Sequence, residues 1–68
     1  MSSTTSLLQD ALNHHRNNRS DLAQSSYQSL LREDPQHADA WHGLGILHAQ
    51  NNDYSDALRC MEKACTFA

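Results

Sequence analysis

Five histidines are the residues of this 68-residue chain with the clearest potential for metal chemistry, because imidazole is a common transition-metal ligand. Their spacing argues against a metal site. His42 and His48 lie six positions apart, and the neighbours His14 and His15 would point about 100° apart on a helix. The chain has no HxxxH or HExxH spacing, so we expect no metal ligands and no cofactor.

The two cysteines and the carboxylates offer no catalytic arrangement either. Cys60 and Cys65 lie five positions apart, about 140° around a helix, which suits neither a disulfide nor a CxxC motif. We therefore expect reduced thiols. The chain contains no GxSxG elbow and no phosphate-binding glycine loop, and its carboxylates fall at expected helix ends or on solvated faces. No enzymatic activity is predicted.

Charge and composition narrow the classes of partner. A formal net charge of −3 with only five Lys and Arg residues provides no basic patch for nucleic acid. The opening MSSTTS is unlike a secretion signal, and no apolar run approaches the roughly 20 residues that cross a bilayer. The composition predicts a small cytoplasmic protein that binds neither nucleic acid nor membrane.

Helical periodicity, a single proline and few β-branched residues predict an all-α chain. Ser6, with Gln9 completing a capping box, is expected to begin the first helix, and Asn18 or Ser20 the second. Pro35 disfavours helix before it and should end the second. After a flexible segment 1–5, the expected helices cover about 6–16, 19–33, 38–50 and 54–67.

Short connections between these helices make sequential neighbours antiparallel, so residues 6–37 and 38–68 should form two hairpins. Asn51 and Asn52 are expected in the second turn, and Asp53 is expected to cap the fourth helix. The hairpins are a repeat. A shift of 34 residues, a spacing typical of one solenoid class, pairs His14 with His48, Asn17 with Asn51, Asn18 with Asn52, and Ala23 with Ala57.

At this spacing, several residue types resemble the tetratricopeptide repeat family. In the second repeat the similar residues are Trp41, Leu44, Gly45, His48, Ala57, Met61 and Ala64. The first repeat is less similar, and its matching residues are Ala11, Ala23, Tyr27 and Pro35. The resemblance implies four antiparallel helices forming a fragment of a right-handed α-solenoid, with these residues in structural packing.

The resemblance also suggests why one helix carries two glycines, each of which costs about 1 kcal/mol relative to alanine. In the family, the glycine of the first helix meets the alanine of the second. Gly45 should therefore face Ala57, and Ala11 should face Ala23. Gly43 lies off the helical stripe formed by Trp41, Leu44, Gly45 and His48. His14 and His48 fall at the family's buried aromatic position.

The function implied by the resemblance is binding of a peptide or partner helix on a concave surface formed by the first helix of each hairpin. The residues expected there are Leu8, Leu12, His15, Arg16, His42, Ile46, Ala49 and Gln50, together with Thr5, Gln9, Asp39 and Gly43. Alternatively, Leu8, Leu12 and Ile46 pack against a neighbouring repeat or chain. Leu8, Leu12 and Gly43 also replace the lysine and asparagines of the chaperone-tail clamp, so that ligand is not expected.

Two repeats without a capping helix leave the last helix partly uncovered, because solenoids usually need about three repeats and a cap. We expect a piece of a larger bacterial protein, self-association through the last helix, or both. The stretch YQSLLREDPQHADAWHGLGILHAQ also resembles repeats that precede the catalytic domains of bacterial glycosyltransferases related to O-linked N-acetylglucosamine transferase. That resemblance implies that this segment docks the protein substrate of such an enzyme. If the parent protein is instead a pure adaptor, the segment would serve as a scaffold for protein binding.

Overall fold

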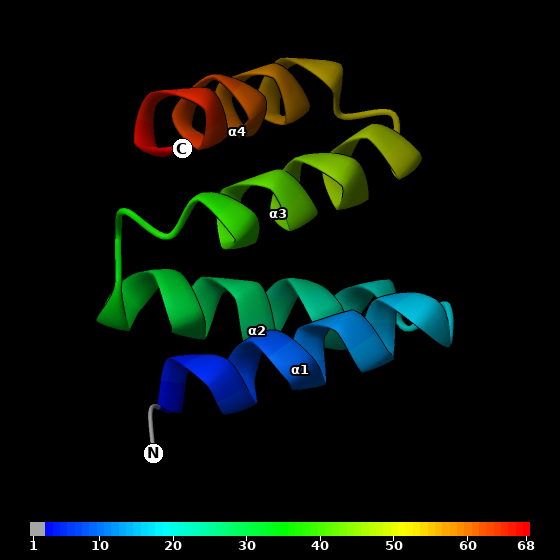
Figure 1. Ribbon diagram of the computed structural model, residues 1–68. Coiled ribbons are helices and arrows are strands. Elements are labelled where there is room, and N and C mark those ends of the chain that lie inside the picture. The colour runs from blue at the N-terminus through cyan, green and yellow to red at the C-terminus, as the bar shows by residue number, and fades with distance from the viewer. Residues whose placement is uncertain (1–2) are drawn as a thin grey trace.

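The computed structural model describes residues 3–68 and folds them into four α-helices (Figure 1). The antiparallel pairs α1–α2 and α3–α4 form two hairpins that stack on each other. This arrangement confirms the all-α prediction. The helices are α1 (Ser3–Arg16), α2 (Ser20–Glu33), α3 (Ala38–Gln50) and α4 (Tyr54–Phe67).

The first helix begins earlier than predicted. α1 starts at Ser3, so Ser6 lies inside the helix and does not cap it, contrary to the sequence analysis. Thr4 and Thr5, which were assigned to a flexible segment, belong to the first helical turn, and residues 1–2 lie outside the described part of the chain. Serine and threonine have only moderate helix penalties, so nothing in this segment prevents the helix from beginning before Ser6.

The turn that closes the first hairpin is a Schellman motif centred on Asn18. The Asn18 backbone has a φ of 60°, a left-handed conformation that asparagine tolerates better than most residues. The Arg19 amide donates to the His14 carbonyl at 2.8 Å, and the Asn18 amide donates to the His15 carbonyl at 3.1 Å. Asn18 therefore ends α1 and does not begin α2, which starts at Ser20.

The second hairpin closes with the same turn. Asn52 has a φ of 64°, and the amides of Asp53 and Asn52 donate to the carbonyls of His48 and Ala49 at 2.8 and 3.1 Å. The predicted side-chain cap at Asp53 is absent. Its carboxylate instead lies 3.9 Å from Nδ1 of His48, because the tight turn brings the two side chains together.

The linker between the hairpins is held by α3. The Trp41 indole donates a hydrogen bond to the Pro35 carbonyl at 2.7 Å, and Nδ1 of His37 accepts one from the Ala40 amide at 3.2 Å. The Lys63 ammonium of α4 lies 5.3 Å from the Trp41 ring centroid, within cation–π range. Trp41 thus connects the linker, α3 and α4.

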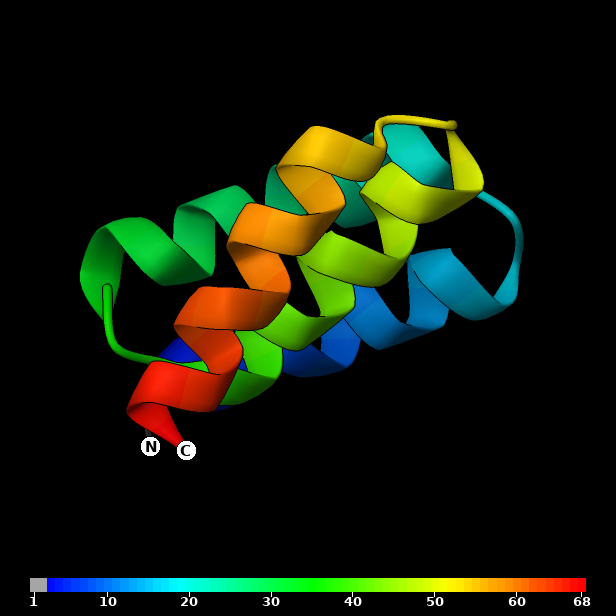
Figure 2. The same cartoon turned by 90° about the horizontal axis from the view of Figure 1, so that it is seen from above.

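The third helix occupies the centre of the stack. α3 packs against both α2 and α4, whereas α4 contacts only α3 among the helices described (Figures 1 and 2). α3 consequently buries two stripes. Gly45 lies on the stripe facing α4, where an added Cβ would stand 3.3 Å from the Ala57 carbonyl oxygen and 3.1 Å from Cε of Met61. Gly43 lies on the stripe facing α2, where it meets Tyr27.

The core contains residues that the sequence analysis did not include. Ala40, Leu47 and Cys60 are buried, because the second stripe of α3 and the inner face of α4 are both covered. His14 and His48 are only half-buried, contrary to expectation, since both stand close to hairpin turns at the edge of the fold. The buried hydrophobic residues are Ala11, Ala23, Tyr27, Leu30, Ala40, Leu44, Leu47, Ala57 and Cys60.

Candidate functional site

A concavity between the two hairpins draws residues from three helices and has a volume of about 350 Å³. This size lies in the lower range of ligand-binding clefts. Two other hollows are confined to the first hairpin, one at its turn and one between α1 and α2. The concavity, here called the groove, is lined by Leu8, Leu12 and His15 of α1, Tyr27 of α2, and Asp39, His42, Gly43 and Ile46 of α3.

The structure brings most of the predicted binding residues into the groove. Leu8, Leu12, His15, His42 and Ile46 line it, as do Asp39 and Gly43. Thr5 and Gln9 of α1 do not line the groove. Arg16, Ala49 and Gln50 also lie outside it, toward the carboxyl ends of α1 and α3. Arg16 and Gln50 are exposed there, and Ala49 is half-buried, so their part in binding stays a prediction.

Apolar side chains form the walls of the groove. Leu12 is 46% exposed although its neighbour Ala11 is fully buried, and Ile46 is half-buried. Leu8 also packs against the hydrophobic core, so it serves both the fold and the groove. An exposed leucine beside a half-buried isoleucine on the adjacent hairpin gives the groove an apolar surface that spans both repeats.

Tyr27 forms part of the groove lining, which the sequence analysis did not predict. It was expected only as a packing residue, and its side chain is indeed 1% exposed. A Cβ added to Gly43 would overlap Cζ and Oη of Tyr27 and would lie 2.7 Å from Cε1. Gly43 therefore gives the tyrosine ring its space. The sequence signal for this contact was a costly glycine lying off the expected packing stripe.

The Tyr27 hydroxyl has no hydrogen-bond partner among the described residues although it is buried. Burial also raises the pKa of Tyr27, because a charged phenolate is disfavoured away from water. Buried tyrosine hydroxyls usually find a partner, so an unpartnered one beneath a surface groove calls for an explanation.

Charge in the groove is carried by a single formal anion. Asp39 is the one carboxylate among the lining residues, and none of them is Lys or Arg. His15 and His42 add two imidazoles, which can donate or accept hydrogen bonds. The groove thus combines an apolar wall, one negative charge and several polar atoms.

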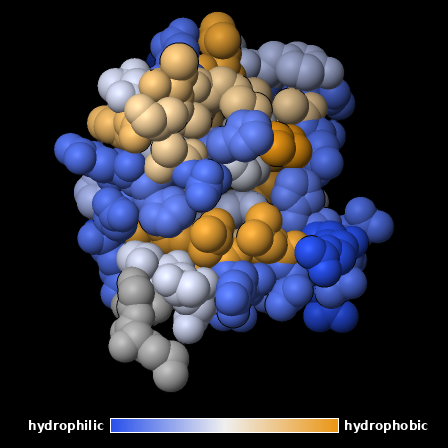
Figure 3. Space-filling model, viewed as in Figure 1, coloured by the Kyte–Doolittle hydropathy of each residue, from blue (hydrophilic) through white to orange (hydrophobic). Residues whose placement is uncertain are grey.

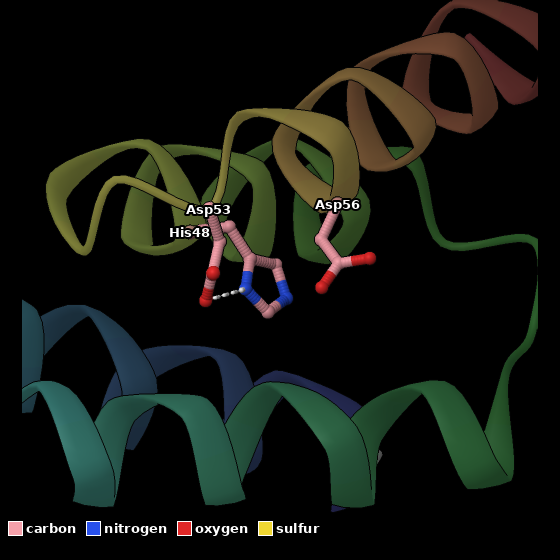
Figure 4. Close-up of side chains that lie close together, drawn as sticks. All are labelled: His48, Asp53 and Asp56. Carbon is pink, nitrogen blue, oxygen red and sulfur yellow. Dashed lines mark ion pairs between the residues drawn. The ribbon is translucent and has the colours of Figure 1, made fainter.

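A second cluster joins the end of α3 to the start of α4. His48, Asp53 and Asp56 project to the same side, with one ligand atom of each within 4.8 Å of the others (Figure 4). Sequence reasoning missed this cluster because it weighed only histidine pairs and treated Asp53 as a cap. Three ligands, two of them exposed, are fewer than the four of a structural zinc site, and His48 and Asp53 already pair. We assign no ion to them.

α4 carries exposed apolar side chains that no other helix among residues 3–68 covers. Tyr54 and Leu58 are 66% and 61% exposed, whereas Met61 is half-buried because it lies against α3 beside Gly45. Hydrophobic side chains reach the surface over the α3–α4 hairpin and in a band along α1–α2 (Figure 3). Among residues 3–68, no helix is both long enough and apolar enough to pass through a lipid bilayer.

The two cysteines are free thiols in different environments. Cys60 is buried and Cys65 is exposed. Burial raises the pKa of the Cys60 thiol, Asp56 raises it further, and Lys63 opposes the shift. A buried thiol that resists ionisation is a packing residue rather than a nucleophile.

A family model described as tetratricopeptide repeat covers residues 8–67, which includes the groove and parts of all four helices. Neither the curated proteins nor the solved structures contain a significant match.

Proposed function

Because the chain belongs to the tetratricopeptide repeat family, whose hairpins serve in protein–protein interaction, we propose that it binds a peptide or helix of a partner protein in the groove. The observation that carries this proposal is the apolar wall shared by the two repeats. Leu12 is 46% exposed on one side, and Ile46 of the next hairpin lies on the other. A contiguous apolar wall that spans two repeats is typical of an interaction surface, whereas a single exposed leucine such as Leu22 is common on protein surfaces.

Two leucine variants test the proposal. Leu12 in the groove and Leu22 on α2 are 46% and 48% exposed, so replacing either with glutamate removes a similar amount of exposed apolar surface. The whole chain and each variant are used as bait in lysate, with bound proteins identified by mass spectrometry. A groove partner is captured by the wild type and Leu22→Glu and lost with Leu12→Glu. Equal recovery by both variants would contradict groove binding.

We propose further that Arg16, Ala49 and Gln50 extend the contact surface beyond the groove. They follow groove residues on α1 and α3, and Arg16 and Gln50 are exposed. A partner longer than the groove would reach them. Arg16→Glu should then weaken binding of the captured partner, whereas a partner confined to the groove would be unaffected.

Self-association is a second candidate, favoured by the exposed apolar residues of α4. Leu58 is 61% exposed, and α4 has no helix on its outer side among the described residues. A second copy of the chain could cover this face. Sedimentation equilibrium would then show a dimer that Leu58→Glu dissociates, and a monomer at all concentrations would remove this candidate.

The remaining expectations concern cellular context. The free thiols fit a reducing compartment, so we propose the cytoplasm as the location.

We propose no catalytic activity for this chain. The narrower hypothesis of a glycosyltransferase docking segment stays a prediction, and sequencing the gene on both sides of these residues tests it directly.

A further inference from the structure

The hydroxyl of Tyr27 lies beneath the groove with no hydrogen-bond partner in the described chain. A phenylalanine would fill the same space without placing a polar atom away from water, which is costly when the atom stays unpaired. The tyrosine therefore has a disadvantage in the free chain. A ligand that provides the missing partner would remove that disadvantage.

Gly43 makes this hydroxyl part of the groove. Any side chain at Gly43 would overlap Cζ and Oη, so only glycine lets the ring tip reach the surface of α3 that faces the groove. Glycine also lowers the stability of the helix interior in which it stands. Two residues, one on each hairpin, thus accept a cost at the same point of the groove.

The groove chemistry indicates an extended ligand rather than a helical one. Helical peptides use their main-chain carbonyls for internal hydrogen bonds, whereas an extended segment presents free carbonyls along its length. The phenolic O–H can donate to such a carbonyl. Leu8, Leu12 and Ile46 offer space for one aliphatic side chain, and Asp39, the only formal charge in the lining, favours a nearby cation.

We propose that the groove holds an extended segment of a partner protein by three contacts, an inference that rests on the proposed function. An aliphatic side chain inserts among Leu8, Leu12 and Ile46. The adjacent main-chain carbonyl accepts a hydrogen bond from Oη of Tyr27. A lysine or arginine next to this anchor faces Asp39.

Access to the hydroxyl requires a small local movement. Tyr27 is 1% exposed, so the ligand must displace at least one lining side chain to reach Oη. Leu12 and His42 are exposed lining residues on α1 and α3. Exposed side chains change rotamer on the picosecond to nanosecond scale, which makes this opening fast compared with peptide binding.

The experiment starts from a displayed library of random nine-residue peptides selected on the whole chain. Enriched peptides should carry one aliphatic position next to lysine or arginine, without the i, i+3, i+4 pattern of a helix. The strongest peptide is synthesised, and fluorescence anisotropy gives its Kd for the wild type, Tyr27→Phe, Leu12→Glu and Leu22→Glu. Melting temperatures verify that each variant folds.

Tyr27→Phe should weaken the Kd about tenfold, as expected for the loss of one hydrogen bond that leaves the peptide carbonyl unpaired. Leu12→Glu should abolish binding, and Leu22→Glu should leave it unchanged. Replacing the anchor amide of the peptide with a thioamide, a weaker acceptor, should weaken wild-type binding and add nothing in Tyr27→Phe. This peptide change remains informative on the wild type even if Tyr27→Phe fails to fold.

The outcomes separate this inference from the proposed function. Binding that requires Leu12 but is indifferent to Tyr27→Phe and to the thioamide would overturn the hydrogen bond and leave groove binding intact. Enrichment of helical or acidic peptides would overturn the extended, basic ligand. Failure to enrich any peptide that Leu12→Glu loses would contradict both.

Discussion

The first helices of the two repeats have the same place in their hairpins but different surroundings. α3 lies between α2 and α4, and it buries Ala40, Leu44 and Leu47. α1 has α2 beside it and touches α3 over a smaller region. The residues 34 positions earlier are polar and exposed, namely Ser6, Asp10 and Asn13. Neighbours in the stack therefore decide which positions of a repeat must be apolar.

The second helices show the same dependence. α2 is covered by α3, and it buries Tyr27 and Leu30 almost completely. The equivalent residues of α4 are Met61 and Ala64, which are half-buried because α4 packs against α3 alone among the described helices. The second helix of a hairpin thus acquires its second buried face only where another hairpin follows it.

The largest predicted effect comes from truncating the central helix. Leu47→Ala should lower the free energy of unfolding by about 2 to 5 kcal/mol, because a fully buried leucine leaves a cavity. Asn13→Ala, the equivalent change in the exposed face of α1, should stay within about 0.5 kcal/mol of the wild type. Urea denaturation measures both. Similar losses of stability from the two variants would show that α1 and α3 do not differ in the burial of these equivalent positions.

The glycines give the next largest effect. Gly43→Ala should destabilise by about 1 to 2 kcal/mol, because the overlap with the buried Tyr27 ring outweighs the gain in helix propensity. Gly45→Ala should change stability by less than about 0.5 kcal/mol, since an added Cβ there meets its neighbours at 3.1 to 3.3 Å and the tight fit roughly cancels the propensity gain. Thermal melts distinguish the two.

Two further substitutions serve as controls for the glycine variants. Gln9→Ala is the repeat-equivalent of Gly43→Ala on an exposed position, and it should be close to neutral. Gly45→Leu is too large for the space beside Ala57 and should cost about 1 to 3 kcal/mol. A stabilised Gly43→Ala variant would show that the tyrosine ring moves aside without penalty.

A smaller effect should be the same in both repeats. Asn18 and Asn52 adopt left-handed backbone conformations in matching turns, so Asn18→Ala and Asn52→Ala should each cost about 1 kcal/mol. Replacement with glycine should be neutral or slightly stabilising at either site. Unequal costs, measured by denaturation of the single variants, would mean that the two turns differ despite their matching hydrogen bonds.

The smallest predicted change is a loss of stability in mild alkali. The pKa values of Cys60 and Tyr27 are raised above 9.0 and 10.0 in the folded chain by burial, so the folded state keeps these protons to higher pH. Above about pH 9 the unfolded chain binds fewer protons, and the free energy of unfolding falls as pH rises. Cys60→Ala should reduce the loss of stability that begins near pH 9, and Tyr27→Phe should reduce the further loss near pH 10 and above. A pH-independent stability between 8 and 10.5 would contradict the burial of both groups.

Local signals in the sequence were sufficient for most helix boundaries. Pro35 marked the end of α2, and the predicted ranges of α3 and α4 match the structure. The start of α1 was predicted too late, because a residue that can cap a helix does not compel the helix to begin there. The matching left-handed conformations of Asn18 and Asn52 were not predicted, because Asn18 was offered as a start of the second helix, although the 34-residue shift pairs the two asparagines.

Contacts between hairpins were beyond such reasoning. Leu47 was overlooked because its burial depends on α2 lying against α3, which the pattern within one hairpin does not reveal. The same contact explains Gly43, whose partner Tyr27 belongs to the preceding repeat. The unpaired state of the Tyr27 hydroxyl is a property of three-dimensional packing that residue types alone do not specify.

We propose that a partner peptide occupies the groove between α1 and α3. The most direct measurement is a two-dimensional amide NMR spectrum of the isotope-labelled chain with and without a selected peptide. Peptide-dependent shifts should cluster at Leu12, His42, Gly43 and Ile46, and the signals of Leu22 and Leu58 should stay unchanged. Shifts that concentrate on α4 or on the outer face of α2 would place the binding surface elsewhere and rule out binding in the groove.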